Sequence, residues 1–391
     1  MSDLAARLIS DLDGRLAAAD AALAADYPGE RPGRQPVHTV YVPADRYDAG
    51  LVPAHGRAAL AAVDDHADAF AELVGDDDIV ARVRAKLERE PVEDLRIDFE
   101  DGYVGRSDDD ETADVERAAR ALAESQANGE AAPFNGIRMK CFESHLRSRA
   151  IRTLTAFVET LEQAGGTRDG WVVTLPKVTS VDQVEAMVHV ANLLDLRFEV
   201  QVETPQSILG PDGSALVARM VHAGGDRLTG LHYGTYDYSA FVGIVAAYQS
   251  LEHPAADHAK AIMQAAAAGT GVRLSDGSTN KLPIGGPDTV VAAWANHHRL
   301  VRRSLEHGFY QGWDLHPAQL PTRYAATYAF YRESLGNALD RLEAYIGHSD
   351  AGGIVDEPAT ARALARYVLR GLDCGAVDES ETRNLPLTTF I

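Results

Sequence analysis

Residues 171–203 read WVVTLPKVTSVDQVEAMVHVANLLDLRFEVQVE, and this stretch decides the fold class. Trp171–Leu175 and Phe198–Val202 are short apolar runs, which are typical of buried strands. Between them, Ser180-Val-Asp-Gln183 has the form of a capping box and predicts the start of a helix, with apolar residues on one face from Val184 onward. A strand, a helix and a second strand in this order predict two parallel strands joined by a crossover helix.

The same alternation of strand-like runs and helical segments continues on both sides of this unit. Eight strands that alternate with helices predict an α/β fold, a (β/α)8 TIM barrel, whose usual length is about 250 residues. We expect the barrel at residues 37–323, an N-terminal helical extension at residues 1–36 and a C-terminal helical extension at residues 324–391. The other six strand-like runs are Val37–Val42, Leu95–Phe99, Gly136–Met139, Leu228–Tyr233, Gly271–Leu274 and Gly312–Leu315.

The 391-residue chain carries 37 Lys and Arg against 58 Asp and Glu, a formal net charge of −21. Such a charge repels the phosphates of nucleic acids and anionic membranes, so we expect neither as a partner. No apolar run reaches the roughly 18 residues of a membrane span, and the acidic, amphipathic N-terminus resembles neither a signal peptide nor a transit peptide. Cys141 and Cys374 form no disulfide framework or CxxC metal site, so a cytoplasmic location is expected.

Charged side chains follow the predicted strands at the point where each strand ends. In a TIM barrel these ends meet at one mouth, where the chemistry takes place. Carboxylates that converge there repel one another, and a hard divalent cation such as Mg2+ relieves this repulsion, while Arg and Lys bind a substrate carboxylate or a developing enolate. In strand order these residues are Asp98, Glu100 and Asp101, then Arg138 and Lys140, then Lys177, Glu203, Asp237, Asp276 and His316.

Six short motifs occupy these strand ends, namely Asp98-Phe-Glu-Asp101, Ile137-Arg-Met139, Leu175-Pro-Lys-Val178, Val202-Glu-Thr204, Gly234-Thr-Tyr-Asp237 and His316-Pro-Ala-Gln319. In identity and order they resemble the motifs of the citrate lyase β-subunit-like (CitE-like) branch of the HpcH/HpaI aldolase superfamily, over about residues 37–319. The chain resembles a divergent, longer member. Lys140 stands where the family usually has Asn, and the usual Lys shortly after Asp101 is missing.

The resemblance implies a role for each strand-end residue. Glu203 and Asp237 would be the direct ligands of Mg2+, with Mn2+ as an alternative cation, and Glu100 and Asp101 would hold metal-bound waters. Arg138 would stabilise the enolate, and Lys177 would compensate the acidic cluster. The expected catalytic set is Arg138, Glu100, Asp101 and Lys177, and the expected substrate contacts are Arg138, Thr204, Pro205, Gly234, Thr235 and Tyr236. The resemblance also implies a homo-oligomer, a trimer or hexamer.

These features predict a Mg2+-dependent carbon–carbon lyase or aldolase that acts through a metal-stabilised enolate. The substrate is a 2-oxo acid or a 3-hydroxyacyl-CoA, and a free 2-oxo acid is preferred because the acidic sequence offers no visible basic groove for CoA phosphates. Two alternatives stay open: a phosphoenolpyruvate- or pyruvate-utilising phosphoryl-transfer enzyme, and a non-catalytic metal-binding subunit of a complex. The chain contains no P-loop, no GxSxG motif and no HExxH motif.

Some polar residues allow two interpretations. His316 is either a proton shuttle or the cap of a turn, and Ser275–Ser278 is either a simple turn or a substrate loop. His297 and His298 are neighbours in a predicted helix and do not face each other, so we expect them at the surface or between subunits rather than on a metal. The apolar run Phe241–Tyr248 is expected to be at most a buried core segment.

Overall fold

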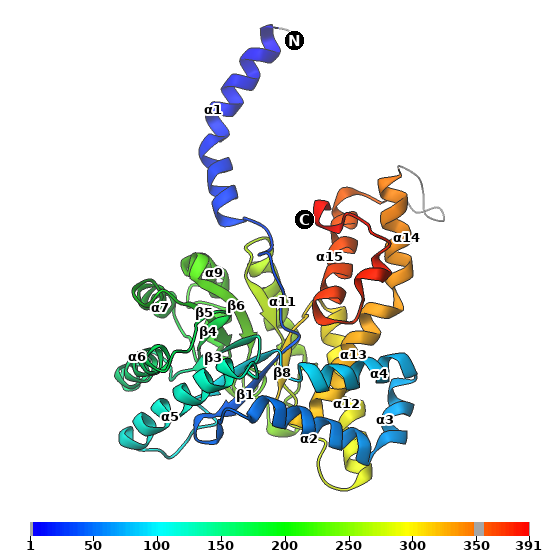
Figure 1. The fold of residues 1–391 in the computed structure, drawn as a ribbon. Coiled ribbons are helices and arrows are strands. Elements are labelled where there is room, and N and C mark those ends of the chain that lie inside the picture. Colours follow the sequence, from blue (N-terminus) through cyan, green and yellow to red (C-terminus); the bar gives the residue numbers. More distant parts are fainter. Residues whose placement is uncertain (1–2, 348–355, 391) are drawn as a thin grey trace.

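The computed structural model describes residues 3–347 and 356–390. Its centre is a parallel eight-stranded sheet in the order β7-β6-β5-β4-β3-β2-β1-β8, which curves into a barrel with helices around it (Figure 1). β7 and β8 meet at a bridge between Ser275 and Gln311, so the barrel is nearly closed. The strands are β1 (His38–Pro43), β2 (Asp94–Asp98), β3 (Phe134–Arg138), β4 (Trp171–Leu175), β5 (Arg197–Val202), β6 (Leu228–Tyr233), β7 (Arg273–Ser275) and β8 (Gly312–Asp314).

The predicted (β/α)8 TIM barrel with helices at both ends of the chain is confirmed, and each of the eight predicted strands is present. The limits of the three segments, at residues 36/37 and 323/324, stay predictions. The helices are α1 (Asp3–Asp26), α2 (Leu51–Asp65), α3 (Ala67–Val74), α4 (Asp77–Arg89), α5 (Asp108–Ala127), α6 (Arg147–Gln163), α7 (Val181–Leu194), α8 (Pro205–Ile208), α9 (Leu216–Gly224), α10 (Thr235–Phe241), α11 (Pro254–Ala267), α12 (Pro287–Glu306), α13 (Leu320–Glu333), α14 (Leu335–Ile346) and α15 (Pro358–Cys374).

The starts of two barrel helices show what the sequence signals do locally. α7 begins where the sequence predicts, but the Ser180 side chain makes no capping hydrogen bond, so the predicted capping box is wrong. Instead, Oε1 of Gln183 accepts a hydrogen bond of 2.8 Å from the backbone N–H of Thr179, which satisfies a donor just before the helix. α5 does begin with a capping box, between Ser107 and Asp110.

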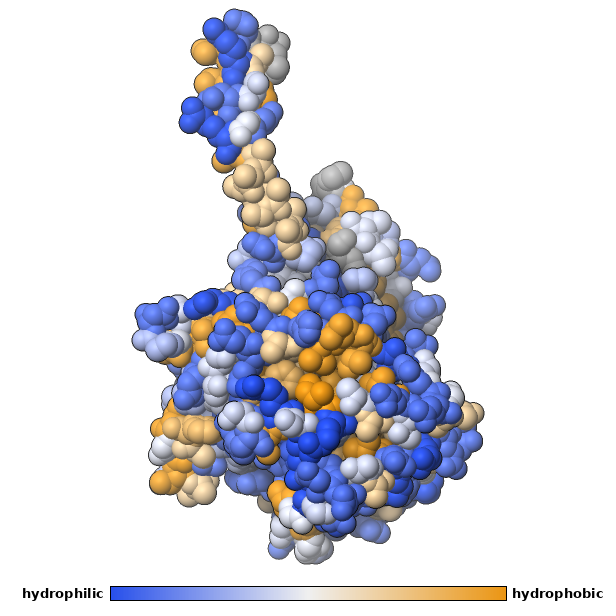
Figure 2. All heavy atoms as spheres, turned by 90° about the vertical axis from the view of Figure 1, so that its left-hand side faces the viewer, coloured by the Kyte–Doolittle hydropathy of each residue, from blue (hydrophilic) through white to orange (hydrophobic). Residues whose placement is uncertain are grey.

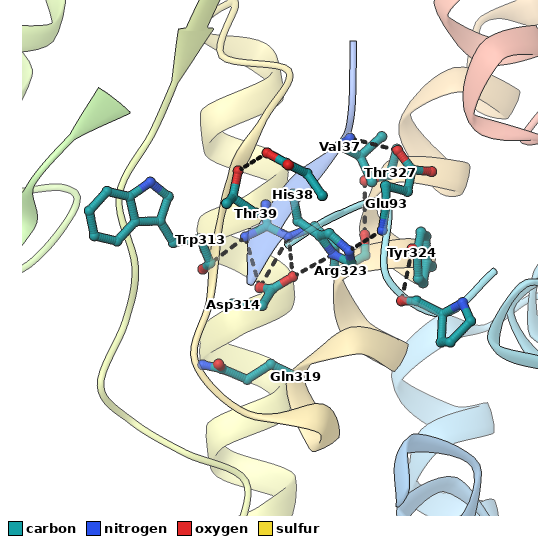
Figure 3. Close-up of polar contacts among 12 residues, drawn as sticks. Val37, His38, Thr39, Glu93, Trp313, Asp314, Gln319, Arg323, Tyr324 and Thr327 are labelled. Atoms are coloured by element: carbon teal, nitrogen blue, oxygen red, sulfur yellow. Dashed lines mark hydrogen bonds and ion pairs between the residues drawn. The ribbon is translucent and has the colours of Figure 1, made fainter. Parts of the chain in front are cut away.

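A buried polar network joins β8 and β1 to the helices outside them (Figure 3). Oδ2 of Asp314 lies 2.9 Å from Nδ1 of His38, and Oδ1 lies 3.0 Å from Nε2 of His297 and 2.9 Å from Nη2 of Arg323. Burial alone would raise the pKa of Asp314, but the charge of Arg323 and the two histidines hold it well below its usual value. This network corrects the expectation for His297, which is buried in the core rather than at the surface.

α1 projects away from the rest of the molecule (Figures 1 and 2), and only its last residue, Asp26, reaches another described helix, with a carboxylate oxygen 3.9 Å from Nδ1 of His222. None of its described residues is buried, although it carries six large apolar side chains, each at least 46% exposed. The run Phe241–Tyr248 is also exposed, at its two ends and at Val245, which corrects the expectation of a core segment. Within the described residues, no helix has the length and apolar character needed to cross a bilayer.

Candidate functional site

Asp98 and Arg138 end neighbouring strands, β2 and β3, and are paired in the sheet register. Nε and Nη2 of Arg138 donate to the two carboxylate oxygens of Asp98 at 2.7 and 2.6 Å. The backbone N–H groups of Glu100 and Gly102 donate to the same carboxylate at 2.9 and 2.8 Å. Both side chains are buried, and this set of hydrogen bonds offsets the loss of water around the two charges. Asp98 therefore positions Arg138 and the turn after β2.

Lys177 follows β4 and joins carboxylates from other strand ends. Its Nζ lies 2.8 Å from Oε1 of Glu100, 2.7 Å from Oδ2 of Asp101 and 3.7 Å from Oδ2 of Asp237. Burial raises the pKa of Glu100 to about 7, although the charge of Arg138 opposes the shift. Burial would also raise the pKa of Asp101, but its hydrogen bonds with Glu100 and Lys177 lower it overall. Lys177 is thus the cation around which these carboxylates gather.

Glu203 follows β5 and is only 1% exposed. The backbone N–H of Lys177 donates to its Oε1 at 2.7 Å. Gly234, directly after β6, leaves room for it: a Cβ on Gly234 would lie 2.4 Å from Cβ of Glu203 and 2.8 Å from its Oε2. Burial raises the pKa of Glu203 to about 8; the charge of Lys177 opposes this shift and that of Asp237 adds to it. Glu203 is therefore a buried carboxylate that lacks full compensation by a cation.

Asp237 lies in the first turn of α10 and completes the acidic group, its side chain 38% exposed. Burial raises the pKa of Asp237 against the opposing charge of Lys177. In the described ranges, no three His, Cys, Asp or Glu side chains are already arranged as ligands of one ion. The chemistry of the possible ligands fits a hard divalent cation all the same. Among the described residues, two cationic side chains, Arg138 and Lys177, stand among five carboxylates, namely Asp98, Glu100, Asp101, Glu203 and Asp237.

Arg138 keeps one nitrogen available toward this acidic group. Its Nη1 makes only long contacts, 3.5 Å to Oε1 of Gln201 and 3.6 Å to Oε2 of Glu100. The ring of Tyr41 lies 4.8 Å from its Cζ and covers one face of the guanidinium. Tyr41 and Gln201 are residues that the sequence analysis missed. Tyr41 shares the inward face of β1 with Thr39, and this two-residue period is the signal that points to it.

Two predicted substrate contacts lie after β5 and have structural partners. Oγ1 of Thr204 donates to the backbone carbonyl of Val178 at 2.6 Å and accepts from the backbone N–H of Ser207 at 3.2 Å. Thr204 therefore caps α8, and Pro205 occupies the first turn of that helix. Substrate contact by either residue stays a prediction.

Two further predicted contacts lie after β6 and hold the loop that follows β7. Oγ1 of Thr235 accepts from the backbone N–H of Ser278 at 3.1 Å, and the Tyr236 hydroxyl accepts from the backbone N–H of Asn280 at 2.6 Å. The loop after β7 therefore packs against Thr235 and Tyr236, the two residues that precede Asp237. This placement is compatible with both interpretations of the loop.

Three other charged residues at strand ends have structural partners. Nδ1 of His316 accepts a 3.1 Å hydrogen bond from the backbone N–H two residues ahead, which is the geometry of a cap. Nζ of Lys140 donates to a backbone carbonyl of the turn after β2 at 2.7 Å. Asp276 is buried and pairs with Nζ of Lys260 at 3.0 Å.

Solved structures with this fold include CitE from Mycobacterium tuberculosis in complex with magnesium, acetoacetate and coenzyme A. It is 19% identical over 88% of this chain and 99% of that chain, with a TM-score of 0.54. CitE from the same organism in complex with magnesium and pyruvate is 18% identical, over 86% and 99% of the two chains, with a TM-score of 0.49. RipC from Yersinia pestis is 17% identical, over 75% and 95%, with a TM-score of 0.46.

The likeness to CitE shows that this chain has a CitE-like fold. No curated protein matches the chain. One family model matches residues 16–390, from the middle of α1 to the last described residue. The chain therefore belongs to the family described as "Domain of unknown function (DUF6986)".

Proposed function

We propose that the chain is a Mg2+-dependent carbon–carbon lyase or aldolase that acts on a small 2-oxo acid. The observation that carries this proposal is the buried carboxylate of Glu203, which accepts from the backbone N–H of Lys177 and whose pKa the nearby charge of Asp237 helps to raise. Enzymes on this fold have their chemistry at the mouth where the C-terminal ends of the strands meet. CitE of M. tuberculosis, on the same fold, is a magnesium complex.

Glu203 and Asp237 would hold the cation, which is Mg2+ or, as the alternative, Mn2+. Bound there, the cation would polarise the substrate carbonyl and make negative charge on its oxygen less costly. Glu100 and Asp101 would accept hydrogen bonds from waters beside it, and Lys177 would balance their charge.

Arg138 would supply the hydrogen bond that strengthens as the carbon–carbon bond breaks. Asp98 locks two of its nitrogens, and Tyr41 covers one face of the guanidinium. Nη1 is the nitrogen with long contacts only, so it is free to donate to the oxygen that becomes negative in the enolate. Because Asp98 fixes the guanidinium in advance, this donor needs no reorganisation during the reaction.

A groove of about 770 Å3 is lined by Asn280 and by residues that follow it, and the backbone N–H of Asn280 donates to the hydroxyl of Tyr236, the neighbour of Asp237. Among the residues that line it, Lys281 is the one cation and Asp288 is a carboxylate. The phosphates of coenzyme A need several cationic contacts, so this groove favours a free 2-oxo acid over a thioester. The CitE complex with acetoacetate and coenzyme A makes the thioester the alternative to test.

We also propose a homo-oligomer, a trimer or hexamer, in the cytoplasm. α1 offers the contact surface. Ile9, Leu12, Leu16, Ala19 and Leu23 follow one another at intervals of three and four, which is the pattern of a coiled coil. These five residues form the apolar stripe of α1. A solitary helix of this length is only marginally stable in water, so the stripe requires a partner surface, and the same stripe on a second copy of α1 supplies one.

The function is tested by proton exchange. With Mg2+ and pyruvate in D2O, we expect the wild-type protein to replace the methyl protons of pyruvate by deuterium, as followed by NMR. Glu203→Ala is expected to abolish the exchange, whereas Glu185→Ala, an exposed glutamate on α7, is expected to keep it. Full activity of Glu203→Ala would refute the assignment of the metal ligand. Absence of exchange with every 2-oxo acid tried would favour a non-catalytic subunit, and clear saturation transfer from coenzyme A would favour the thioester.

A further inference from the structure

A second polar cavity, of about 440 Å3, lies at the opposite end of the barrel, where the strands begin. Its lining includes the first residues of β4, β5 and β7, namely Trp171, Arg197 and Arg273. The strands begin on the side of the barrel from which α1 leaves (Figure 1). Strands β4, β5 and β6 are five or six residues long, at about 3.3 Å per residue, so about 15–20 Å separate this cavity from the carboxylates around Lys177.

The floor of the cavity consists of buried charges that neutralise one another. Arg96 pairs with Asp94 and, at 3.0 Å, with Oε2 of Glu199. Nε2 of His232 lies 2.9 Å from the same glutamate oxygen. Burial would raise the pKa of Glu199, but Arg96 and His232 lower it overall. These four residues therefore satisfy one another and close the cavity toward the barrel interior.

The rim differs from the floor. Arg197 and Arg273 line it, Arg31 lies near both, and none of these three arginines forms an ion pair with a described carboxylate. Arg197 is exposed, and in the described part of the chain its side chain makes no hydrogen bond or ion pair. Arg273 donates to the backbone carbonyls of Arg34 and Gly33, both at 2.7 Å. Arg31 donates to the backbone carbonyl of Leu228 at 2.9 Å. Carbonyl contacts fix the side chains of Arg31 and Arg273 in place without pairing either with a carboxylate.

Arg31, Arg197 and Arg273 are here called the arginine triad, and Arg31 lies close enough to each of the other two for their charges to repel. Burial is the main cause that lowers the pKa of Arg31, and the charge of Arg197 lowers it further. Burial is also the main cause that lowers the pKa of Arg273, and the charge of Arg31 lowers it further. Three like charges held together in a chain of net charge −21 are unfavourable unless an anion lies among them.

The carboxylates near the triad do not supply this anion. Asp195 on the rim is already paired with Arg227 at 2.8 Å. Asp226 partly offsets the shift of Arg31, and Asp373 and Glu30 partly offset that of Arg273, yet the pKa of both arginines stays lowered. The remaining lining carboxylate, Asp169, forms no ion pair with any described residue.

We propose that the arginine triad binds a small dianion of the phosphate type, either inorganic phosphate or a phosphate monoester. Guanidinium groups present paired N–H donors that match the oxygens of phosphate, and Arg197 has all of its donors free for this purpose. A cavity of about 440 Å3 has room for a phosphate that carries a few carbon atoms. The site is distinct from the proposed lyase site, and its test is independent of enzymatic activity.

Isothermal titration of the full chain with inorganic phosphate tests the proposal, in EDTA-containing buffer at constant ionic strength set with chloride. We expect one site per chain, and about tenfold weaker binding in Arg197→Gln. Because the Arg197 side chain makes no hydrogen bond or ion pair with a described residue, this variant is expected to have the wild-type melting temperature when phosphate is absent. Arg219→Gln, an exposed arginine on α9 outside the cavity lining, is the matched control and is expected to bind as the wild type does.

Titration with glycerol 3-phosphate distinguishes the two sources of the phosphate group. Tighter binding of the ester than of inorganic phosphate identifies an ester as the ligand, and equal or weaker binding identifies the free ion. Sulfate, with the same shape and charge, is expected to compete. Absence of saturable phosphate binding, equal binding by Arg197→Gln and the wild type, or tighter binding of citrate than of either phosphate would each overturn the proposal.

Discussion

The backbone N–H of Lys177 donates a 2.7 Å hydrogen bond to Oε1 of Glu203, and Lys177 makes this bond with φ at 52°. A left-handed backbone at a non-glycine residue costs of order 1–3 kcal/mol and persists only where surrounding contacts hold it. Here those contacts include the ion pairs of the Lys177 ammonium group with Glu100 and Asp101. One residue thus fixes carboxylates that follow two different strands, through its backbone on one side and its side chain on the other.

Replacement of Lys177 by Met should separate these two roles. The backbone hydrogen bond to Glu203 remains possible, but Glu100 and Asp101 lose their cation. Because the Glu100 side chain is only 9% exposed, we expect the free energy of unfolding at pH 7.5 to fall by about 2 kcal/mol. Urea denaturation measures this loss. Lys281→Met, at an exposed lysine of the mouth, is the control and should stay within about 0.5 kcal/mol of the wild type.

Gly234→Ala should impair the proposed cation site without destroying the fold. The new Cβ would lie 2.4 Å from Cβ of Glu203, so the glutamate must shift. We expect at least a tenfold loss of Mg2+ affinity in titration calorimetry and a loss of stability of about 1–3 kcal/mol. Gly336→Ala is the control, because nothing lies within 4 Å of its Cβ position in α14, and it should leave Mg2+ binding unchanged. Unchanged Mg2+ affinity in Gly234→Ala would argue against Glu203 as a ligand.

Arg138→Lys should show that the guanidinium geometry matters and not the charge alone. Lysine cannot donate simultaneously to both oxygens of Asp98 in the way that Nε and Nη2 do. We expect a loss of about 2–4 kcal/mol in unfolding free energy, since a buried carboxylate loses paired donors. We also expect pyruvate exchange to fall at least a hundredfold. Retained exchange in a stably folded Arg138→Lys protein would exclude Arg138 from the chemistry.

The positions of the strands could be predicted where glycine or proline residues mark their two ends. Trp171–Leu175 lies between Gly170 and Pro176, and its predicted limits are those of β4. The strand predicted at Gly271–Leu274 begins two residues later, as β7 at Arg273. No glycine or proline stands directly before Arg273 to mark this start. Once a barrel is predicted, the strand-end carboxylates are expected to lie together, because parallel strands bring their C-terminal ends to one mouth.

What could not be predicted depends on packing between segments far apart in the chain. Tyr41 and Arg138 lie 97 positions apart in the sequence, and only the barrel brings Cζ of Arg138 to 4.8 Å from the centre of the Tyr41 ring. His297 looked like a surface residue because a helix pattern does not show that α13 and β8 cover it. The arginine triad likewise joins residues from three separate segments, so no local motif marks it.

Acid should destabilise the protein partly through His298. Burial, with repulsion from Arg302 and His297, lowers the pKa of His298 to about 4, below its unfolded value of 6.5. The unfolded chain therefore binds the proton more readily, and the contribution of His298 to stability is present above pH 6.5 and lost as the pH falls toward 4, by up to about 3 kcal/mol. Urea denaturation from pH 7 to pH 4 should show a smaller fall for His298→Gln. His258→Gln, at an exposed histidine of α11, should follow the wild type.

The exposed stripe of α1 should control self-association. Leu16 lies in the middle of the stripe and is 49% exposed in the single chain, so Leu16→Glu places a charge within the proposed contact. Arg15 and Asp20, five residues apart, flank the stripe at positions that pair between parallel helices.

We expect wild-type oligomers in light scattering after gel filtration, and smaller species for Leu16→Glu. Ala21→Glu, on the opposite face of α1, should assemble as the wild type does. An unchanged mass for Leu16→Glu would place the contact on another surface, because a buried charge at this position is incompatible with a helix-to-helix interface.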